Sequence, residues 1–143
     1  MQYRRLGRTE LKVSCIGLGG MGVISQNHPD RASADKIIHT ALERGVNFID
    51  TARSYFDSEE IIGSALQGRS EQVYLATKTY QRSAKRAEKE IETCFEKLKV
   101  KKIHLFQLHH VQYMKEFQQA SAPGGTIELL QSLQKEGLID HIG

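Results

Sequence analysis

Short apolar runs and longer amphipathic stretches follow one another along this chain. The runs are rich in Val, Ile and Leu and end at glycine or polar residues, which is typical of buried strands. They predict strands over 13–18, 46–50, 72–78 and 103–108, and the start of a fifth over 138–143. Ahead of the first run, an Arg-Thr turn between extended-type residues indicates a small N-terminal hairpin over 3–13.

The segments between these runs carry apolar residues at three- and four-residue steps, the spacing of an amphipathic helix. Their predicted starts are Ser33, Asp57 (with Glu60 completing a capping-box pattern), Ser83 and Ile127. Glycines follow three of these helices and are expected to stop them. A polar loop is expected over 23–31, and a longer loop over 110–125, which a Pro-Gly-Gly sequence interrupts.

Strands and helices therefore alternate four times, in units of about 30 residues, as expected for β-α-β repeats. Such alternation indicates an α/β protein with a parallel sheet and helical crossovers. Two architectures fit: a doubly wound open sheet, or part of a (β/α)8 barrel. No linker or second domain is apparent, so we expect one domain over 1–143.

Composition narrows the function classes. The chain has 143 residues, of which 39% are hydrophobic, and its net charge is +3. No apolar run approaches the roughly 20 residues of a membrane span, and no signal-peptide pattern opens the chain, so we expect a cytoplasmic protein without a membrane partner. Its basic stretch over 82–89 is interleaved with acidic residues at helical spacing and lacks aromatic residues, which argues against nucleic-acid binding. Cys15 and Cys94 lie in apolar segments and are expected to be buried, reduced thiols.

A glycine-rich motif, Gly-Leu-Gly-Gly-Met-Gly over 17–22, satisfies G-x-G-x-x-G directly after a predicted strand. In dinucleotide-binding sheets the third glycine opens a helix, and an acid about 20 residues further on binds the ribose. Here a polar loop containing Pro29 separates Gly22 from the next helix, and Asp50 lies 28 residues beyond Gly22. The glycines are therefore expected to let a turn pass close to a ligand or a neighbouring loop.

Ionisable residues stand at the predicted carboxyl ends of three consecutive strands. These are Asp50, Lys78 and His109, and Tyr55 lies in the loop after Asp50. In α/β barrels that edge of the sheet carries the catalytic groups.

The four residue types suit proton donation to a carbonyl oxygen during hydride transfer. A tyrosine has a pKa of about 10, and a nearby ammonium that pairs with a carboxylate is expected to lower it. A histidine beside the tyrosine can orient the carbonyl. Because no side chain supplies a hydride, this chemistry implies a nicotinamide cofactor.

Several segments together resemble the aldo-keto reductases, which are NAD(P)H-dependent (β/α)8-barrel enzymes. The matching segments are RRLGRTELKVSCIGLGGMG, ALERGVNFIDTARSY, SEEIIGSAL, VYLATK, HLFQLH and LQKEGLIDHIG. TARSYFDSEE and the APGG before the last helix resemble most the bacterial branch that often carries a C-terminal iron–sulfur domain.

The resemblance implies site residues and ligands. The expected catalytic residues are Asp50, Tyr55, Lys78 and His109, with Tyr55 as general acid, and the expected cofactor-binding residues are Gly19, Gly20, Met21 and Asp50. The cofactor is NADP or NAD, and the substrate is a small carbonyl compound. No metal is expected, and no cysteine cluster for an iron–sulfur centre is present in this sequence.

The sequence departs from the family pattern in two ways. His104 stands where the family has an acid, which we interpret as a packing variation, and Asp140 stands where the family has a basic residue. The chain also supplies four βα units and the start of a fifth strand, whereas a complete barrel has eight. We therefore expect a truncated, partial barrel whose open edges allow homo-oligomers. The alternative to an enzyme is a non-catalytic half-barrel that associates as a structural module.

Overall fold

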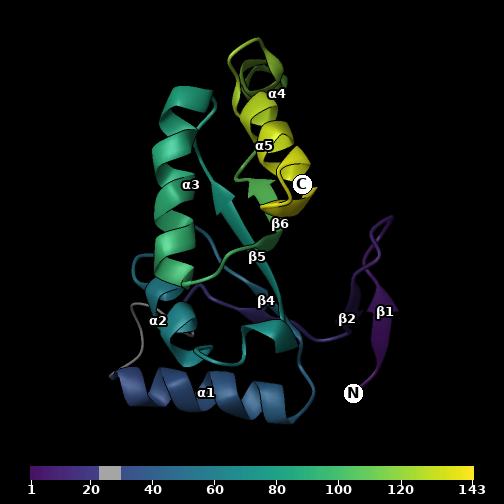
Figure 1. The fold of residues 1–143 in the computed structure, drawn as a ribbon, viewed down its shortest axis with the longest axis vertical. Helices are drawn as coiled ribbons and strands as arrows, with labels where there is room; N and C mark the ends of the chain where they lie inside the picture. The colour runs from purple at the N-terminus through teal and green to yellow at the C-terminus, as the bar shows by residue number, and fades with distance from the viewer. Residues whose placement is uncertain (23–29) are drawn as a thin grey trace.

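The computed structural model describes residues 1–22 and 30–143, and its main feature is a five-stranded parallel sheet (Figure 1). The strands are hydrogen-bonded to one another in chain order, which excludes the doubly wound alternative and gives a partial (β/α)8 barrel. The strands are β3 (Leu18–Gly19), β4 (Phe48–Asp50), β5 (Tyr74–Thr79), β6 (Ile103–Leu108) and β7 (Ile139–Ile142).

The predicted N-terminal hairpin is confirmed as β1 (Tyr3–Arg5) paired with β2 (Lys12–Ser14). The single strand predicted over 13–18 is wrong, because Ser14 ends the hairpin and the sheet begins only at β3. Two hydrogen bonds explain the break. The Ser14 amide donates to Asn47 Oδ1 at 2.6 Å, and Ser14 Oγ donates to the Ile16 carbonyl at 2.7 Å, so these polar groups hold the chain in a bend.

Helices connect the parallel strands and contact one another in the order α1, α2, α3, α5 around the sheet. In Figure 1, α1 and α2 lie in the lower part of the view, near the N-terminus, and α3 and α5 lie above them. The bounds are α1 (Arg31–Glu43), α2 (Ser58–Ala65), α3 (Ala84–Leu98), α4 (Met114–Ser121) and α5 (Thr126–Lys135), with a 3₁₀ turn at Ser70–Gln72.

One predicted helix start and one predicted capping box need correction. The cap of α1 is Asp30 rather than Ser33, because the Ser33 amide donates to Asp30 Oδ1 at 2.6 Å. Asp57 precedes α2 but its side chain makes no capping hydrogen bond. Its predicted capping-box partner, Glu60, instead pairs with Arg31 at 3.3 Å on the surface. Most of the polar loop predicted over 23–31 lies outside the described residues.

The segment predicted as a loop over 110–125 contains the helix α4. Glu116 in its first turn accepts hydrogen bonds from the backbone N–H groups of Gln112 at 2.7 Å and Tyr113 at 3.1 Å. These bonds satisfy donors that have no partner within the helix, and they hold the pKa of Glu116 below its usual value. The helix buries little apolar surface, so hydrophobic periodicity did not reveal it.

The core lies between the sheet and the helices. Ile49, Leu75 and Phe106 point from successive strands into this layer and are fully buried. Cys94 of α3 is buried with them, as predicted, whereas Cys15 is exposed because it lies in the bend between hairpin and sheet. No helix in the described part of the chain is long and apolar enough to cross a membrane.

Candidate active site

The parallel register brings the predicted strand-end residues to one edge of the sheet. Asp50 pairs with Ala76 across β4 and β5, and Lys78 pairs with Gln107 across β5 and β6. His109 follows β6 directly, and its amide donates to the Thr79 carbonyl at 2.9 Å. Carboxylate, ammonium and imidazole thus come from three adjacent strands.

Asp50 and Lys78 form a close ion pair. Lys78 Nζ donates to Asp50 Oδ2 at 2.6 Å and to the Thr51 carbonyl at 2.8 Å. The lysine side chain is 12% exposed and the aspartate side chain 36%. The ammonium is therefore fixed by two acceptors, while the carboxylate remains accessible beside it.

Tyr55 lies against this ion pair. Lys78 Nζ is 5.2 Å from the centre of the Tyr55 ring. Within the described part of the chain no hydrogen-bond partner is found for the Tyr55 hydroxyl, so this hydroxyl is available to a bound molecule. Burial, followed by the negative charge of Asp50, raises the pKa of Tyr55 above its ordinary value. The expected lowering of this pKa by the ammonium is therefore wrong, because burial and the charge of Asp50 outweigh the effect of Lys78.

His109 completes the group and is 7% exposed. Its ring meets Tyr55 edge-on at 5.5 Å between centres, and its Nδ1 lies 3.3 Å from Ser54 Oγ. Burial and the positive charge of Lys78 lower the pKa of His109. The imidazole is consequently neutral at neutral pH and can act as a hydrogen-bonding group toward a carbonyl.

A small pocket of about 200 Å³ opens at this edge. It is lined by Met21, Ser54, Tyr55, Phe56, Tyr80, His109 and His110. Tyr80 stacks on His109 with 4.3 Å between ring centres. The structure thus brings together Asp50, Tyr55, Lys78 and His109 and places Met21 at the same edge.

Sequence reasoning missed three residues that support the site. Ser54 contacts His109, Tyr80 stacks on it, and Arg82 donates to the backbone carbonyl of His109. Each lies within a few positions of the carboxyl end of a strand, and this position in the loop is the signal by which it could have been found.

Of the two glycines at the end of β3, Gly20 is closely packed and Gly19 has open space around it. A Cβ on Gly20 would lie 2.4 Å from Ser58 Oγ and 2.9 Å from Thr51 Oγ1. A Cβ on Gly19 would meet nothing within 4 Å. Gly20 therefore lets the turn pass close to the neighbouring loop, while Gly19 and Met21 are exposed beside the pocket.

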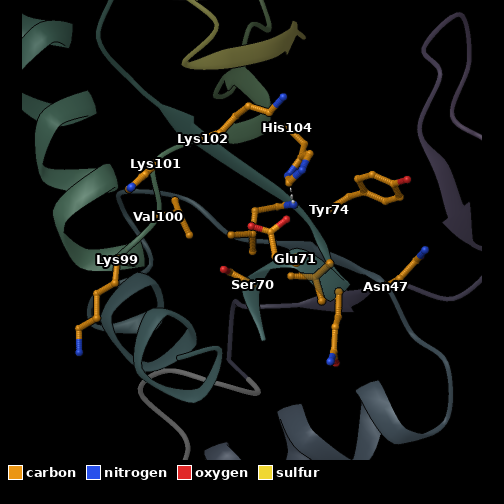
Figure 2. A pocket seen from close by; sticks show the side chains of 12 residues that line it. Asn47, Ser70, Glu71, Tyr74, Lys99, Val100, Lys101, Lys102 and His104 are labelled. Atoms are coloured by element: carbon orange, nitrogen blue, oxygen red, sulfur yellow. Dashed lines mark hydrogen bonds between the residues drawn. The ribbon is translucent and has the colours of Figure 1, made fainter. Parts of the chain in front are cut away.

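A larger pocket, of about 620 Å³, lies at the opposite, amino-terminal end of the strands (Figure 2). Lys99, Lys101 and Lys102 contribute to its lining, but Figure 2 shows their side chains diverging. Lys102 pairs with Asp140 at 2.7 Å. This pocket therefore offers no converging charged groups comparable to those at the carboxyl edge. No group of metal-ligating side chains occurs in residues 1–22 and 30–143.

Comparison with known proteins places this chain in a family. The model of the aldo/keto reductase family matches residues 15–143. The aldo-keto reductase YhdN of Bacillus subtilis is 32% identical over 159 residues, which cover all of this chain and 46% of YhdN. The uncharacterized oxidoreductase YqkF of the same organism is 31% identical over all of this chain and 48% of its own length.

Solved structures agree with the sequence comparison. The holo form of an aldo-keto reductase from Bacillus halodurans superimposes with a TM-score of 0.84 at 30% identity, over all of this chain and 50% of that one. A Klebsiella pneumoniae aldo-keto reductase in complex with NADPH gives 0.78 at 25% identity, over 92% of this chain and 45% of that one. This chain spans about half the length of these relatives. By sequence and by fold, the chain belongs to the aldo/keto reductase family.

Proposed function

We propose that this chain carries the catalytic residues of an NAD(P)H-dependent reductase that converts aldehydes or ketones to alcohols. The observation that carries the proposal is the cluster at the carboxyl edge of the sheet. There the Lys78–Asp50 pair lies against the Tyr55 ring, and neutral His109 lies at the edge of the same ring. Family membership supports oxidoreductase chemistry of this kind.

In this proposal the reaction adds a hydride and a proton across the carbonyl bond. A dihydronicotinamide held beside Asp50, Gly19 and Met21 would supply the hydride to the carbonyl carbon. Tyr55 Oη donates its proton to the carbonyl oxygen, which becomes the alcohol hydroxyl. Tyr55 is left as a phenolate. The raised pKa keeps Tyr55 protonated before the reaction, so the acid is present when substrate binds.

Three further residues, Lys78, Asp50 and His109, assist this proton transfer. The Lys78 ammonium stabilises the phenolate as it forms, because opposite charges attract strongly in a partly buried site. Asp50 holds Lys78 in place through the 2.6 Å ion pair. His109 is held by Ser54 and Tyr80 and orients the substrate carbonyl toward Tyr55.

The exposed residues beside the ion pair fit the nicotinamide end of the cofactor. One Asp50 oxygen accepts from Lys78, and the side chain is a third exposed, so an acceptor for ribose hydroxyls remains. Gly19 and Met21 present an uncrowded turn next to it. Gly20 contributes by packing that turn against Thr51 and Ser58 rather than by direct contact. The proposal accepts either NADP or NAD.

The test uses the purified 143-residue chain. Binding of NADPH is followed by the change in its fluorescence, and turnover with 4-nitrobenzaldehyde by absorbance at 340 nm. We expect the chain to bind NADPH and to oxidise it only in the presence of the aldehyde. A well-folded chain that does neither contradicts the proposal of a catalytic unit and leaves the non-catalytic half-barrel as the function that fits.

A further inference from the structure

Glu59 is a buried carboxylate that the proposed reaction does not use. It lies in the first turn of α2 and is 1% exposed. Thr77 Oγ1 donates to its Oε1 at 2.7 Å, and the Arg53 guanidinium forms an ion pair with its Oε2. Burial and this carboxylate also raise the pKa of the Cys94 thiol, which stays protonated. A buried charge is costly to place in a core even when it has polar partners, so the location of Glu59 calls for an explanation.

Arg53 connects this carboxylate to the loop that carries Tyr55. Its guanidinium contacts Glu59 and also donates to the Phe56 carbonyl at 3.3 Å. Its backbone amide donates to the Lys78 carbonyl at 3.0 Å. Phe56 adopts a left-handed backbone conformation with φ of 50°, which is unfavourable for a bulky residue without support. Tyr55 therefore stands between two backbone positions that Arg53 anchors.

The same carboxylate is tied to the strand that carries Lys78. Thr77, its other partner, immediately precedes Lys78 in β5, and alternate side chains of a strand point to opposite faces. Thr77 thus faces the helices and meets Glu59, while Lys78 faces the site and meets Asp50. One buried group links the tyrosine loop to the lysine strand.

We propose that Glu59 is a positioning residue for Tyr55, acting through Arg53 to fix the loop 53–56 relative to Lys78. This inference rests on the proposed function, in which proton transfer requires the Tyr55 phenol to lie close to the Lys78 ammonium. A purely structural ion pair would stabilise the fold and leave the environment of Tyr55 unchanged.

The first test observes Tyr55 without requiring activity. The five tyrosines are labelled with ¹³C at Cζ, and the Tyr55 resonance is assigned from Tyr55→Phe. In Glu59→Gln and in Arg53→Lys we expect the Tyr55 resonance to shift and its pKa to fall toward the ordinary value, because the loosened ring loses burial. Arg53→Lys keeps both charges and removes the second guanidinium donor, so a shift there arises from geometry rather than from lost charge.

Glu60→Gln is the matched control. It makes the same change at the next position of α2, where the side chain is half exposed and pairs with Arg31. We expect the Tyr55 resonance to be unchanged in this variant. If Glu59→Gln does not fold, Arg53→Lys carries the test, since Arg53 lies nearer the surface and its charge is retained. A folded Arg53→Lys chain whose Tyr55 signal and pKa match those of the parent overturns the proposal.

The second test uses turnover. If the parent chain reduces 4-nitrobenzaldehyde, both variants are expected to lower kcat by roughly 10- to 100-fold with KM within about a factor of two, since misplaced catalytic groups slow the chemical step. Unchanged kcat in both variants overturns the positioning role. An inactive parent chain contradicts the proposed function instead, and the tyrosine resonances still decide whether Glu59 positions Tyr55.

Discussion

The pKa values of Tyr55 and His109 are shifted in opposite directions. Burial raises the pKa of Tyr55 and lowers that of His109, because a low-polarity environment disfavours the charged form of each. At neutral pH one residue is therefore a neutral proton donor and the other a neutral hydrogen-bonding group. This pairing suits the proton donation to a carbonyl that we propose.

Replacing Lys78 with Met tests how the charges of the site are coupled. Lys78 lowers the pKa of His109, and Asp50 raises it. Lys78→Met removes the cation and leaves Asp50 without its partner, so the pKa of His109 is expected to rise while burial keeps it below that of an exposed histidine. The imidazole proton shifts of His109, followed by NMR against pH, measure it. A midpoint that does not move contradicts the described geometry.

Gly20→Ala tests the close approach of the turn to the neighbouring loop. The new Cβ would overlap Ser58 Oγ and Thr51 Oγ1, so we expect a loss of about 1–3 kcal/mol in the free energy of unfolding, as for overpacked cores. Gly19→Ala is the control, because a Cβ there meets nothing within 4 Å. Urea unfolding of the two variants measures the difference, and equal stabilities would be inconsistent with this packing.

For individual residues, the sequence indicated which four side chains meet at the edge of the sheet, but it did not indicate the contacts that hold them there. Asp50, Lys78 and His109 could be located because each ends a strand, and parallel strands end at one edge. The contacts of Arg53 and Glu59 depend on the conformation of a loop, including a positive φ at Phe56. Neither periodicity nor residue type in the chain reports such a conformation.

At the scale of the elements, a hydrogen bond to the side chain of His104 links the amino-terminal ends of β5 and β6. His104 Nδ1 accepts a hydrogen bond from the Leu75 amide at 3.1 Å, and its ring meets Tyr74 edge-on (Figure 2). An imidazole can accept at Nδ1 only when that nitrogen is unprotonated. His104 is thus a packing residue, as predicted, and it also supplies an acceptor to the sheet.

Acid is expected to weaken this junction. Burial lowers the pKa of His104, so the unfolded chain takes up a proton at a higher pH than the folded one. The stability it contributes is complete above the ordinary histidine pKa of about 6.5 and is lost as pH falls below it. In His104→Gln the acceptor remains but does not titrate, so the free energy of unfolding should depend less on pH between about 7 and 5 than in the parent. Identical pH dependence, measured by urea unfolding, contradicts this account.

Most elements could be predicted because their burial is periodic. The four predicted helices and the later strands match the structure closely, since each buries an apolar face against the sheet. The strand predicted over 13–18 and the helix α4 differ for a common reason. In both places polar groups decide the backbone, through Ser14 in the first and Glu116 in the second.

For the whole molecule, the described sheet ends in two edge strands, β3 and β7. Residues on the face away from the helices, such as Phe48 and Leu105, are only partly buried. Unpaired strand edges beside such a surface favour association with another chain. Homo-oligomers formed through these edges therefore remain our prediction for the 143-residue chain.

Size-exclusion chromatography with light scattering, over a dilution series, tests this prediction. We expect a mass above 16.2 kDa that falls on dilution. A monodisperse monomer at all concentrations would show that the open edges do not associate.

Tyr55→Phe tests most directly whether Tyr55 donates the proton in carbonyl reduction. The variant removes one hydroxyl and keeps the ring against Lys78 and His109. We predict that it still binds NADPH, as judged by fluorescence, but oxidises it with 4-nitrobenzaldehyde at least about 100-fold more slowly than the parent chain. Reduction of the aldehyde by Tyr55→Phe at the parent rate would contradict the account.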